Sequence, residues 1–152
     1  MSDTHNDTNS ISHAIEQQPT ANTILHLGDF HTDVEVPSYL YDKKEFIQVS
    51  GNCDSNSSVP ITRELDVLGK KIFMTHGHMY SVKESLNFFL TDAKNRRCNI
   101  ALYGHTHVPM NTYQSGIYVM NPGSLKGKNA TYGIIDIFED GSINTQIIKL
   151  YK

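Results

Sequence analysis

The chain has 152 residues, of which 38% are hydrophobic, and a formal net charge of -3. This length supports one hydrophobic core, so we expect a single domain over residues 1–152. The small negative charge excludes an extended basic surface for nucleic acid, and no apolar run approaches the roughly 18 residues of a membrane-spanning helix. Two isolated cysteines, with no C-x-x-C pair and no secretory leader, favour a cytoplasmic protein.

Five apolar runs alternate with polar turns, and their composition predicts β-strands. Each run ends in a short polar cluster. In chain order they are TILHL (23–27) before Gly28-Asp29, EFIQVS (45–50) before Gly51-Asn52, KIFMT (71–75) before His76-Gly77-His78, NIALY (99–103) before Gly104-His105-Thr106-His107, and IYVM (117–120) before Asn121-Pro122-Gly123-Ser124. Ligands in α/β folds bind outside the carboxyl ends of strands, so the five clusters are expected to share one rim.

Helical spacing of apolar residues marks two segments, residues 10–18 and residues 81–97. In the second segment Ser81 and Glu84 have the spacing of an N-terminal capping box, and Phe88 is expected in the core with its apolar neighbours. The segment 52–60 is predicted to be a loop.

Residues 132–152 are predicted to form two strands joined by a hairpin at Asp140-Gly141, with a structural role only.

The histidines His105 and His107 are separated by one residue after an apolar run. If strand geometry continues into the turn, alternation directs both rings to the same side, which suits a metal better than a core. The pair alone is a weak signal, because solvated loop histidines have the same spacing. The rest of the chain has to decide between the two interpretations.

Seven side chains of the polar clusters are candidate metal ligands without any thiolate among them. They are Asp3, His5, Asp29, Asn52, His76, His105 and His107. A mixed carboxylate, amide and imidazole set suits Mn, Fe, Co, Ni or Zn in open coordination. Seven ligands are too many for one ion, but a bridging carboxylate would divide them into two sets of four, as a two-metal hydrolase requires.

Six short motifs lie in a characteristic order, D-x-H, G-D, G-N-C-D, H-G-H, G-H-T-H and N-P-G-S. With these motifs the sequence resembles the calcineurin-like metallophosphoesterase superfamily, specifically its small single-domain bacterial and archaeal phosphodiesterases. The resemblance implies an α/β fold, a four-layer α-β-β-α sandwich of two mixed β-sheets flanked by helices. It also implies that Asp3, His5, Asp29 and His107 bind one ion, and that Asp29, Asn52, His76 and His105 bind the other, with Asp29 as the bridge.

The activity implied by the resemblance is a dimetal-dependent phosphodiesterase, in which a metal-bridging hydroxide attacks the phosphodiester. Mn²⁺ is the preferred ion, with Ni²⁺, Co²⁺, Fe²⁺ and Zn²⁺ as alternatives. Asp29, Asn52 and His76 are the expected catalytic residues, and His78 is a candidate for substrate contact or proton delivery, the alternative being a solvated turn residue.

The expected partner is a small phosphodiester substrate, with nucleotides among the candidates, and the sequence leaves open a homo-oligomer. The alternative function is a non-catalytic protein-binding scaffold of the same fold, similar to the retromer scaffold subunit. Survival of all seven ligands in the sequence favours the enzyme.

Two features depart from the family pattern. Cys53 stands where larger relatives have a histidine that assists the leaving group, and a neutral thiol is a poor acid, which predicts good leaving groups and a space-filling role for Cys53. Relatives also have an apolar strand before the D-x-H motif, whereas only Met1 and Ser2 precede Asp3 here. A central strand is therefore expected to be missing, and the simplest explanation is a start assigned at an internal methionine. If the chain does begin at Met1, we expect Asp3 and His5 on a frayed terminus.

Overall fold

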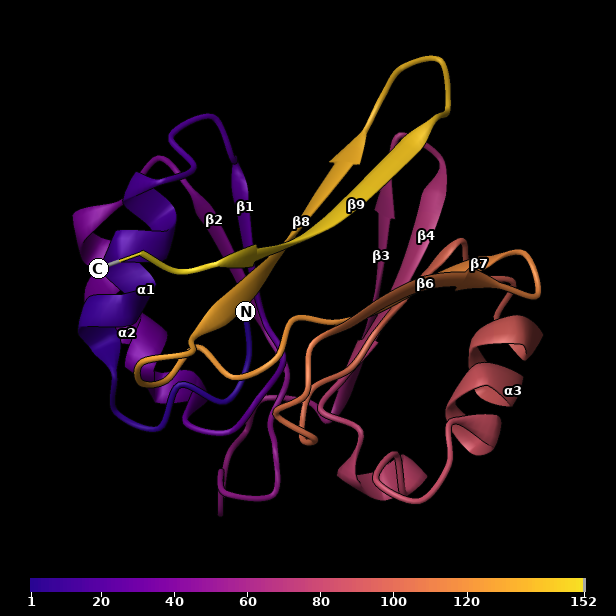
Figure 1. Cartoon of the computed structure of the whole chain (residues 1–152), viewed down its shortest axis with the longest axis horizontal. Coiled ribbons are helices and arrows are strands. Elements are labelled where there is room, and N and C mark those ends of the chain that lie inside the picture. The colour runs from indigo at the N-terminus through magenta and orange to yellow at the C-terminus, as the bar shows by residue number, and fades with distance from the viewer. Residues whose placement is uncertain (152) are drawn as a thin grey trace.

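The computed structural model describes residues 1–151, which form an α/β sandwich with helices on both outer faces (Figure 1). The helices, including two 3₁₀ turns, are α1 (Thr8–Glu16), η1 (His31–Val34), α2 (Glu35–Leu40), η2 (His78–Tyr80) and α3 (Asn87–Asn95). The strands are β1 (Thr23–His26), β2 (Glu45–Gln48), β3 (Thr62–Val67), β4 (Lys70–Thr75), β5 (Ile100–Leu102), β6 (Met110–Gln114), β7 (Ile117–Asn121), β8 (Thr131–Ile137) and β9 (Ile143–Lys149). The predicted α/β class is confirmed; Lys152, the last residue of the predicted hairpin, lies outside the described residues.

The larger sheet has five strands in the order β3-β4-β5-β7-β6. Its three central strands, β4, β5 and β7, are parallel, and the two edge strands are antiparallel to their neighbours. α3 covers one face of this sheet (Figure 1), where Phe73 of β4, Phe89 of α3 and Val119 of β7 lie in one core cluster. The central strands are apolar because both of their faces are covered.

The other half of the sandwich consists of two separate pairs of strands rather than one mixed sheet. β1 and β2 are parallel, and α1 and α2 lie on their outer side (Figure 1). β8 and β9 form an antiparallel hairpin around Asp140-Gly141, as predicted. Ile11 and Ile15 of α1 pack with Ile24 of β1 and Tyr132 of β8. Helix α1 therefore contacts both the β1–β2 pair and the β8–β9 hairpin.

The first residues of the chain run alongside β1 and are well ordered by backbone hydrogen bonds. The Met1 amino group donates to Leu25 O at 2.8 Å, Leu27 N donates to Met1 O at 2.9 Å, and Asp3 N donates to Gly28 O at 3.1 Å. Burial lowers the pKa of the Met1 amino group to about 5. Asp3 is fully buried, so the expected frayed terminus is wrong.

The second predicted helix begins later than the sequence indicates, at Asn87 instead of Ser81. Ser81 has a left-handed backbone with φ of 51°, and its carbonyl accepts from Glu84 N at 2.9 Å in a turn, so the predicted capping box does not form. Because the helix starts at Asn87, Phe88 falls on its outer face and is 75% exposed, which corrects its predicted place in the core.

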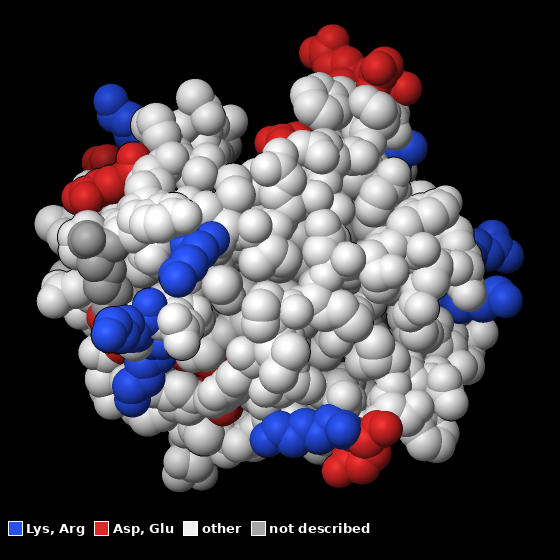
Figure 2. Space-filling model, in the orientation of Figure 1, with Lys and Arg blue, Asp and Glu red and all other residues white. Residues whose placement is uncertain are grey.

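The strands β3 and β6, the helix α2 and the two 3₁₀ helices η1 and η2 were not predicted. The segment of β3, TRELDV, has no buried residue, and β6 is similarly polar because both are edge strands with one open side. None of the helices within residues 1–151 is both long enough and apolar enough to cross a membrane. Figure 2 shows Lys, Arg, Asp and Glu in small separate groups around the rim of the visible face.

Candidate metal centre

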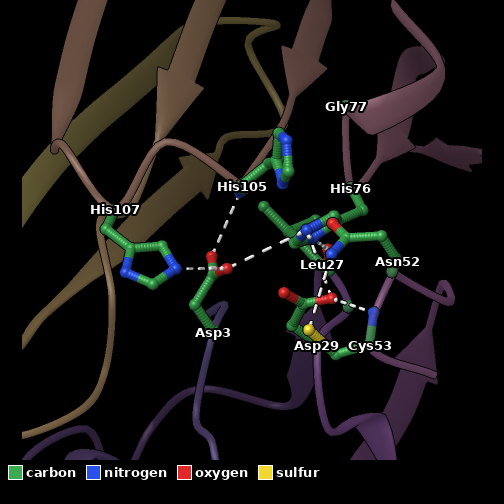
Figure 3. A network of polar contacts seen from close by, with 12 residues as sticks. Asp3, Leu27, Asp29, Asn52, Cys53, His76, Gly77, His105 and His107 are labelled. Atoms are coloured by element: carbon green, nitrogen blue, oxygen red, sulfur yellow. Dashed lines mark hydrogen bonds and ion pairs between the residues drawn. The ribbon is translucent and has the colours of Figure 1, made fainter. Parts of the chain in front are cut away.

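Polar side chains from the ends of several strands meet at one rim of the molecule (Figure 3). Asp29 follows β1, His76 follows β4, and His105 follows β5. The segment that carries Asp3 runs beside β1 and reaches the same rim. The sequence therefore predicted the location of this cluster correctly from the polar residues at the strand ends.

The first group of candidate ligands is Asp3, His5 and His107, whose nearest ligand atoms all lie within 4.8 Å of one another. His107 Nε2 is 3.1 Å from Asp3 Oδ1, and the rings of His5 and His107 have centroids 5.3 Å apart. Asp3 is fully buried, whereas His107 is exposed. The group is therefore open to solvent on the His107 side.

The second group is Asp29, His76 and His105, which meets the same distance criterion of 4.8 Å. His76 Nε2 lies 3.4 Å from Asp29 Oδ1, and the rings of His76 and His105 have centroids 5.0 Å apart. Asn52 extends beside His76 in Figure 3. Asp29, Asn52, His76 and His105 are the four residues that the family resemblance assigns to one ion.

Asp29 links the two groups, because its carboxylate also lies within 4.8 Å of ligand atoms of His5 and Cys53 in a third group. Its Oδ1 accepts a hydrogen bond from Cys53 N at 2.8 Å. Burial acts to raise the pKa of Asp29, but contacts with His76 and with Cys53 outweigh it and lower this pKa well below its usual range. Asp29 is therefore a carboxylate at neutral pH and lies next to members of both ligand groups.

Four buried polar atoms at this rim have no hydrogen-bond partner among the described residues: Asp3 Oδ1, His5 Nε2, His76 Nε2 and His78 Nδ1. His76 Nδ1 lies 2.8 Å from Leu27 O and donates to this carbonyl, while Nε2 faces the carboxylates of Asp3 and Asp29 at 3.9 and 3.4 Å. Burial acts to lower the pKa of the His76 ring, but these two carboxylates outweigh it and raise this pKa. Buried groups of this kind are costly unless they are paired. A divalent cation would satisfy them, so the residues fit the predicted metal site.

The backbone of five candidate ligands is left-handed, with φ of 55° at Asp3, 45° at His5, 58° at Asp29, 67° at His105 and 59° at His107. Strained backbone of this kind persists only where the surrounding structure fixes it, and it clusters at functional sites. β5 ends at Leu102, before the two histidines. Strand alternation therefore does not apply to them, and His105 turns toward His76 while His107 turns toward Asp3 (Figure 3).

The loops that carry Asp29 and Asn52 touch each other closely. A side chain at Gly51 would collide with Asp29 Oδ1, and one at Gly28, where φ is 91°, would approach Gly51 N to 2.6 Å. Asp54 joins the same loops, since it accepts hydrogen bonds from the backbone N–H of Asp29 at 2.9 Å and of Gly51 at 2.7 Å. The sequence interpretation gave Asp54 no role, although the G-N-C-D motif contains it.

A second set of buried hydrogen bonds holds the segment of Asp3 and His5. Thr4 Oγ1 donates to Asp33 Oδ2 at 2.7 Å and lies 3.2 Å from His26 Nε2, while Gly28 N donates to His26 Nδ1 at 3.2 Å. Burial lowers the pKa of His26, so its ring is neutral and donates to Thr4. No motif identified Asp33, which sequence reasoning missed.

The turn after β7 supports the histidine loop. Asn121 Nδ2 donates to Gly104 O at 2.8 Å and to Thr106 Oγ1 at 3.0 Å, and Ser124 Oγ donates to Asp3 O at 2.8 Å. The Asn121 side chain therefore braces the loop that carries His105 and His107, and Ser124 braces the segment of Asp3.

Replacing Thr4 by Val is expected to destabilise the protein by about 1–3 kcal/mol, because it leaves the His26 ring N–H without its buried partner and removes one of the two hydrogen bonds to Asp33 Oδ2. Urea unfolding, compared with the parent chain, measures this change. Ser10→Ala is the matched control, since the buried Ser10 hydroxyl has no hydrogen-bond partner among residues 1–151. Equal effects of the two substitutions would show that the Thr4 contacts contribute nothing specific.

His78 and Cys53 lie beside the two ligand groups but belong to neither of them. The His78 ring lies 5.6 Å from that of His76 and 6.2 Å from that of His105, and burial followed by the charge of His76 lowers its pKa. Partial burial and the Asp29 carboxylate raise the pKa of the Cys53 thiol to about 11. This raised pKa keeps the Cys53 thiol protonated near neutral pH, which makes it a poor attacking nucleophile.

A family model described as the calcineurin-like phosphoesterase superfamily domain matches residues 1–140. The chain belongs to this superfamily. Among its relatives, this calcineurin-like phosphoesterase is 36% identical to the phosphodiesterase YfcE of Escherichia coli strain K12 over 102 residues, which cover 59% of the chain but only 52% of YfcE. It is 29% identical to the phosphodiesterase MJ0936 of Methanocaldococcus jannaschii over 157 residues, which cover 90% of each protein.

Solved structures with the calcineurin-like phosphoesterase fold include enzymes and other proteins. A structure described as a novel archaeal phosphodiesterase is 25% identical, with a TM-score of 0.71 and 97% of each chain covered. Vps29 of Entamoeba histolytica in complex with Zn²⁺ is 18% identical, with a TM-score of 0.70, 93% of this chain and 89% of Vps29 covered. The Vps29 likeness shows the fold alone, and the named phosphodiesterases indicate a hydrolase of this family.

Proposed function

We propose that this chain is a phosphodiesterase that binds two divalent cations, preferably Mn²⁺, and hydrolyses a small phosphodiester in the cytoplasm. Nucleotides are among the candidate substrates. The observation that carries the proposal is the pair of ligand groups, Asp3 with His5 and His107, and Asp29 with His76 and His105. Asp29 lies next to members of both, as a shared ligand would.

The charge and the orientation of the site residues support this assignment. Two carboxylates, Asp3 and Asp29, are buried with no Lys or Arg against them among the contacts of the described residues. Two divalent cations would supply the missing positive charge, make hydroxide available near neutral pH, and stabilise the phosphate oxygens during attack. The Leu27 carbonyl holds the His76 ring, and the backbone N–H of His105 donates to Asp3 Oδ2 at 3.2 Å, so both side chains are fixed before any ion binds.

His78 is the side chain suited to contact the substrate, because it lies beside the ligand groups without belonging to them. Its ring is only partly buried, and burial lowers its pKa, so it is neutral near pH 7. A neutral imidazole can donate one hydrogen bond to a phosphate oxygen and can exchange a proton with water. We assign His78 to substrate contact and leave the proton of the leaving group to water or to His78.

Cys53→Ala is expected to leave hydrolysis of an aryl phosphodiester within a few-fold of the parent rate. The thiol is neutral, and an aryl leaving group needs little protonation. Steady-state rates with bis(4-nitrophenyl) phosphate measure this, with Cys98→Ala as the control on the buried cysteine elsewhere in the chain. A loss of about a thousandfold or more, comparable to removal of an essential group, would give Cys53 a catalytic role.

The proposal is tested by hydrolysis of bis(4-nitrophenyl) phosphate by the metal-stripped chain, before and after addition of Mn²⁺. We expect turnover that depends on Mn²⁺ and is abolished by a chelator, with the monoester 4-nitrophenyl phosphate cleaved more slowly. Absence of turnover in a chain that binds Mn²⁺ would favour the alternative, a non-catalytic scaffold of the same fold. Turnover that is unchanged by chelation would contradict the metal-dependent mechanism.

A further inference from the structure

The candidate ligands His5 and His76 differ in how their rings are held. The Leu27 carbonyl orients the His76 ring by accepting from Nδ1 at 2.8 Å. His5 Nε2 is buried but has no hydrogen-bond partner among the described residues, and the His5 ring packs against those of Phe30 and His107, with centroid distances of 5.1 and 5.3 Å. The direction of the His5 ring therefore depends on the backbone that carries it.

His5 lies in a tight turn, Thr4 to Asp7, whose two central residues have a left-handed backbone. Asp7 N donates to Thr4 O at 2.9 Å, and φ is 45° at His5 and 68° at Asn6. Positive φ at both central positions is typical of a type I′ turn, in which Gly, Asn and Asp dominate and a bulky ring is unfavourable. The turn that directs His5 is therefore strained, and it persists only where its surroundings hold it.

One carboxyl oxygen holds this turn from outside. Asp33 Oδ2 accepts hydrogen bonds from Thr4 Oγ1 at 2.7 Å and from Asn6 N at 2.8 Å, so it binds the residues on either side of His5. Asp33 lies in η1 and is only 7% exposed, and a hydrogen bond is stronger in such an environment than in water. A single buried side chain therefore fixes the backbone on both sides of the ligand.

The start of η1 also contacts the His5 ring itself. Phe30 precedes η1, its carbonyl accepts from Asp33 N at 2.9 Å, and its ring lies edge-on to that of His5. Asp33 is therefore connected to His5 in two ways, through the turn and through Phe30.

The second ligand group is held by contacts that do not involve Asp33. The Leu27 carbonyl orients His76, and Cys53 N donates to Asp29 Oδ1 at 2.8 Å. Loss of the Asp33 side chain should therefore affect the ion of the first ligand group selectively.

We propose that Asp33 is a positioning residue for the first metal ion, because its hydrogen bonds to Thr4 and Asn6 keep the His5 ring directed at the site. Asp33 itself is not a member of any of the ligand groups at the rim. The inference rests on the proposed function, since it requires that the first ligand group binds a cation. Residues that orient a metal ligand typically contribute about ten- to a hundredfold to metal affinity.

The test measures Mn²⁺ affinity in two single-site versions of the full chain. His105→Ala should keep only the ion of the first group, and His107→Ala only the ion of the second. Adding Asp33→Ala is expected to weaken Mn²⁺ binding by about tenfold or more in the His105→Ala chain, and by less than about twofold in the His107→Ala chain. Titrations in which electron paramagnetic resonance reports free Mn²⁺ give both affinities.

Three further substitutions in the His105→Ala chain separate hydrogen bonding from charge and from stability. Asp33→Asn keeps an acceptor oxygen in the same place, so its affinity should stay within about threefold of the unsubstituted single-site chain. Asn6→Gly added to Asp33→Ala should restore most of the lost affinity, because Gly adopts positive φ without strain. Tyr132→Phe is the stability control, since it removes two hydrogen bonds near the C-terminal end of α1, and it should not change the affinity.

Equal weakening in both single-site chains would indicate a general loosening of the fold and would overturn the proposal. A loss with Asp33→Asn as large as with Asp33→Ala would overturn it as well, because the effect would then come from charge. If circular dichroism shows that Asp33→Ala does not fold, Asp33→Ser, with a side chain one atom shorter than that of Asp, takes its place.

The same measurements distinguish failure of this proposal from failure of the proposed function. One ion bound in each single-site chain, with no effect of Asp33→Ala on either, would overturn the positioning role and leave the two-metal function intact. No bound Mn²⁺ in either single-site chain or in the parent would overturn the proposed function, and the positioning role with it.

Discussion

Replacing Asp29 by Asn is expected to lower phosphodiester hydrolysis by about a thousandfold or more and to weaken binding of both ions together. The Asp29 carboxylate lies within 4.8 Å of ligand atoms from both halves of the site, His5 on one side and His76 and His105 on the other. An amide is neutral and offers a single oxygen, so it cannot serve two cations equally. Rates with bis(4-nitrophenyl) phosphate and metal content after desalting measure the two effects.

Asp42→Asn is the matched control, because Asp42 is an exposed carboxylate beyond α2. Its rate and its metal content should equal those of the parent chain. Near-parental activity of Asp29→Asn, with two ions still bound, would refute the shared-ligand assignment. Circular dichroism of both variants separates loss of the site from loss of the fold.

Removal of divalent metal is expected to lower the melting temperature by roughly 8–16 °C relative to the Mn²⁺-saturated protein. Ions that bind only the folded state stabilise it by about 4 kcal/mol when their concentration is a thousand times the dissociation constant, and 1 kcal/mol corresponds to about 2–4 °C in a domain of this size. The cause lies in the buried Asp3 and Asp29 carboxylates, which have no Lys or Arg against them among the contacts of the described residues, and in His76 Nε2, which has no hydrogen-bond partner there. Thermal melts in chelator and across a Mn²⁺ titration measure the difference.

Two histidine variants locate the source of this stabilisation. His107→Gln should lose part of the shift, since His107 lies 3.1 Å from Asp3 in the first ligand group. His13→Gln should retain all of it, because His13 is exposed on α1, away from the rim. A melting temperature that does not respond to Mn²⁺ in the parent chain would contradict a metal site that is built into the fold.

Much of the rim was predictable from the sequence, because it depends on a local rule. Each apolar run ends at a polar cluster, and the ends of β1, β4 and β5 do place Asp29, His76 and His105 next to one another. The family resemblance then predicted the division of the ligands into two sets, which agrees with the observed groups but still awaits a measurement of bound metal. The α1 helix and the β8–β9 hairpin followed from periodicity and from the Asp-Gly turn.

The remaining features depend on tertiary contacts that a single sequence does not reveal. The strands β3 and β6 are polar edge strands whose neighbours, β4 and β7, hold them in place. Ser81 has the composition of a helix cap, but its left-handed backbone delays the start of α3 to Asn87. Asp33 lies 29 residues after Thr4, and only the fold brings these two side chains to 2.7 Å.

The account is tested most directly by the number of Mn²⁺ ions bound per chain at saturation, measured by elemental analysis on the parent and on His105→Ala and His107→Ala. We predict two ions in the parent and one in each variant, since the two histidines belong to different ligand groups. The ion that is kept should differ between the variants, and Mn²⁺ electron paramagnetic resonance distinguishes the coupled pair from a single ion. One ion or none in the parent chain, or loss of both ions in only one variant, would contradict the two-metal centre.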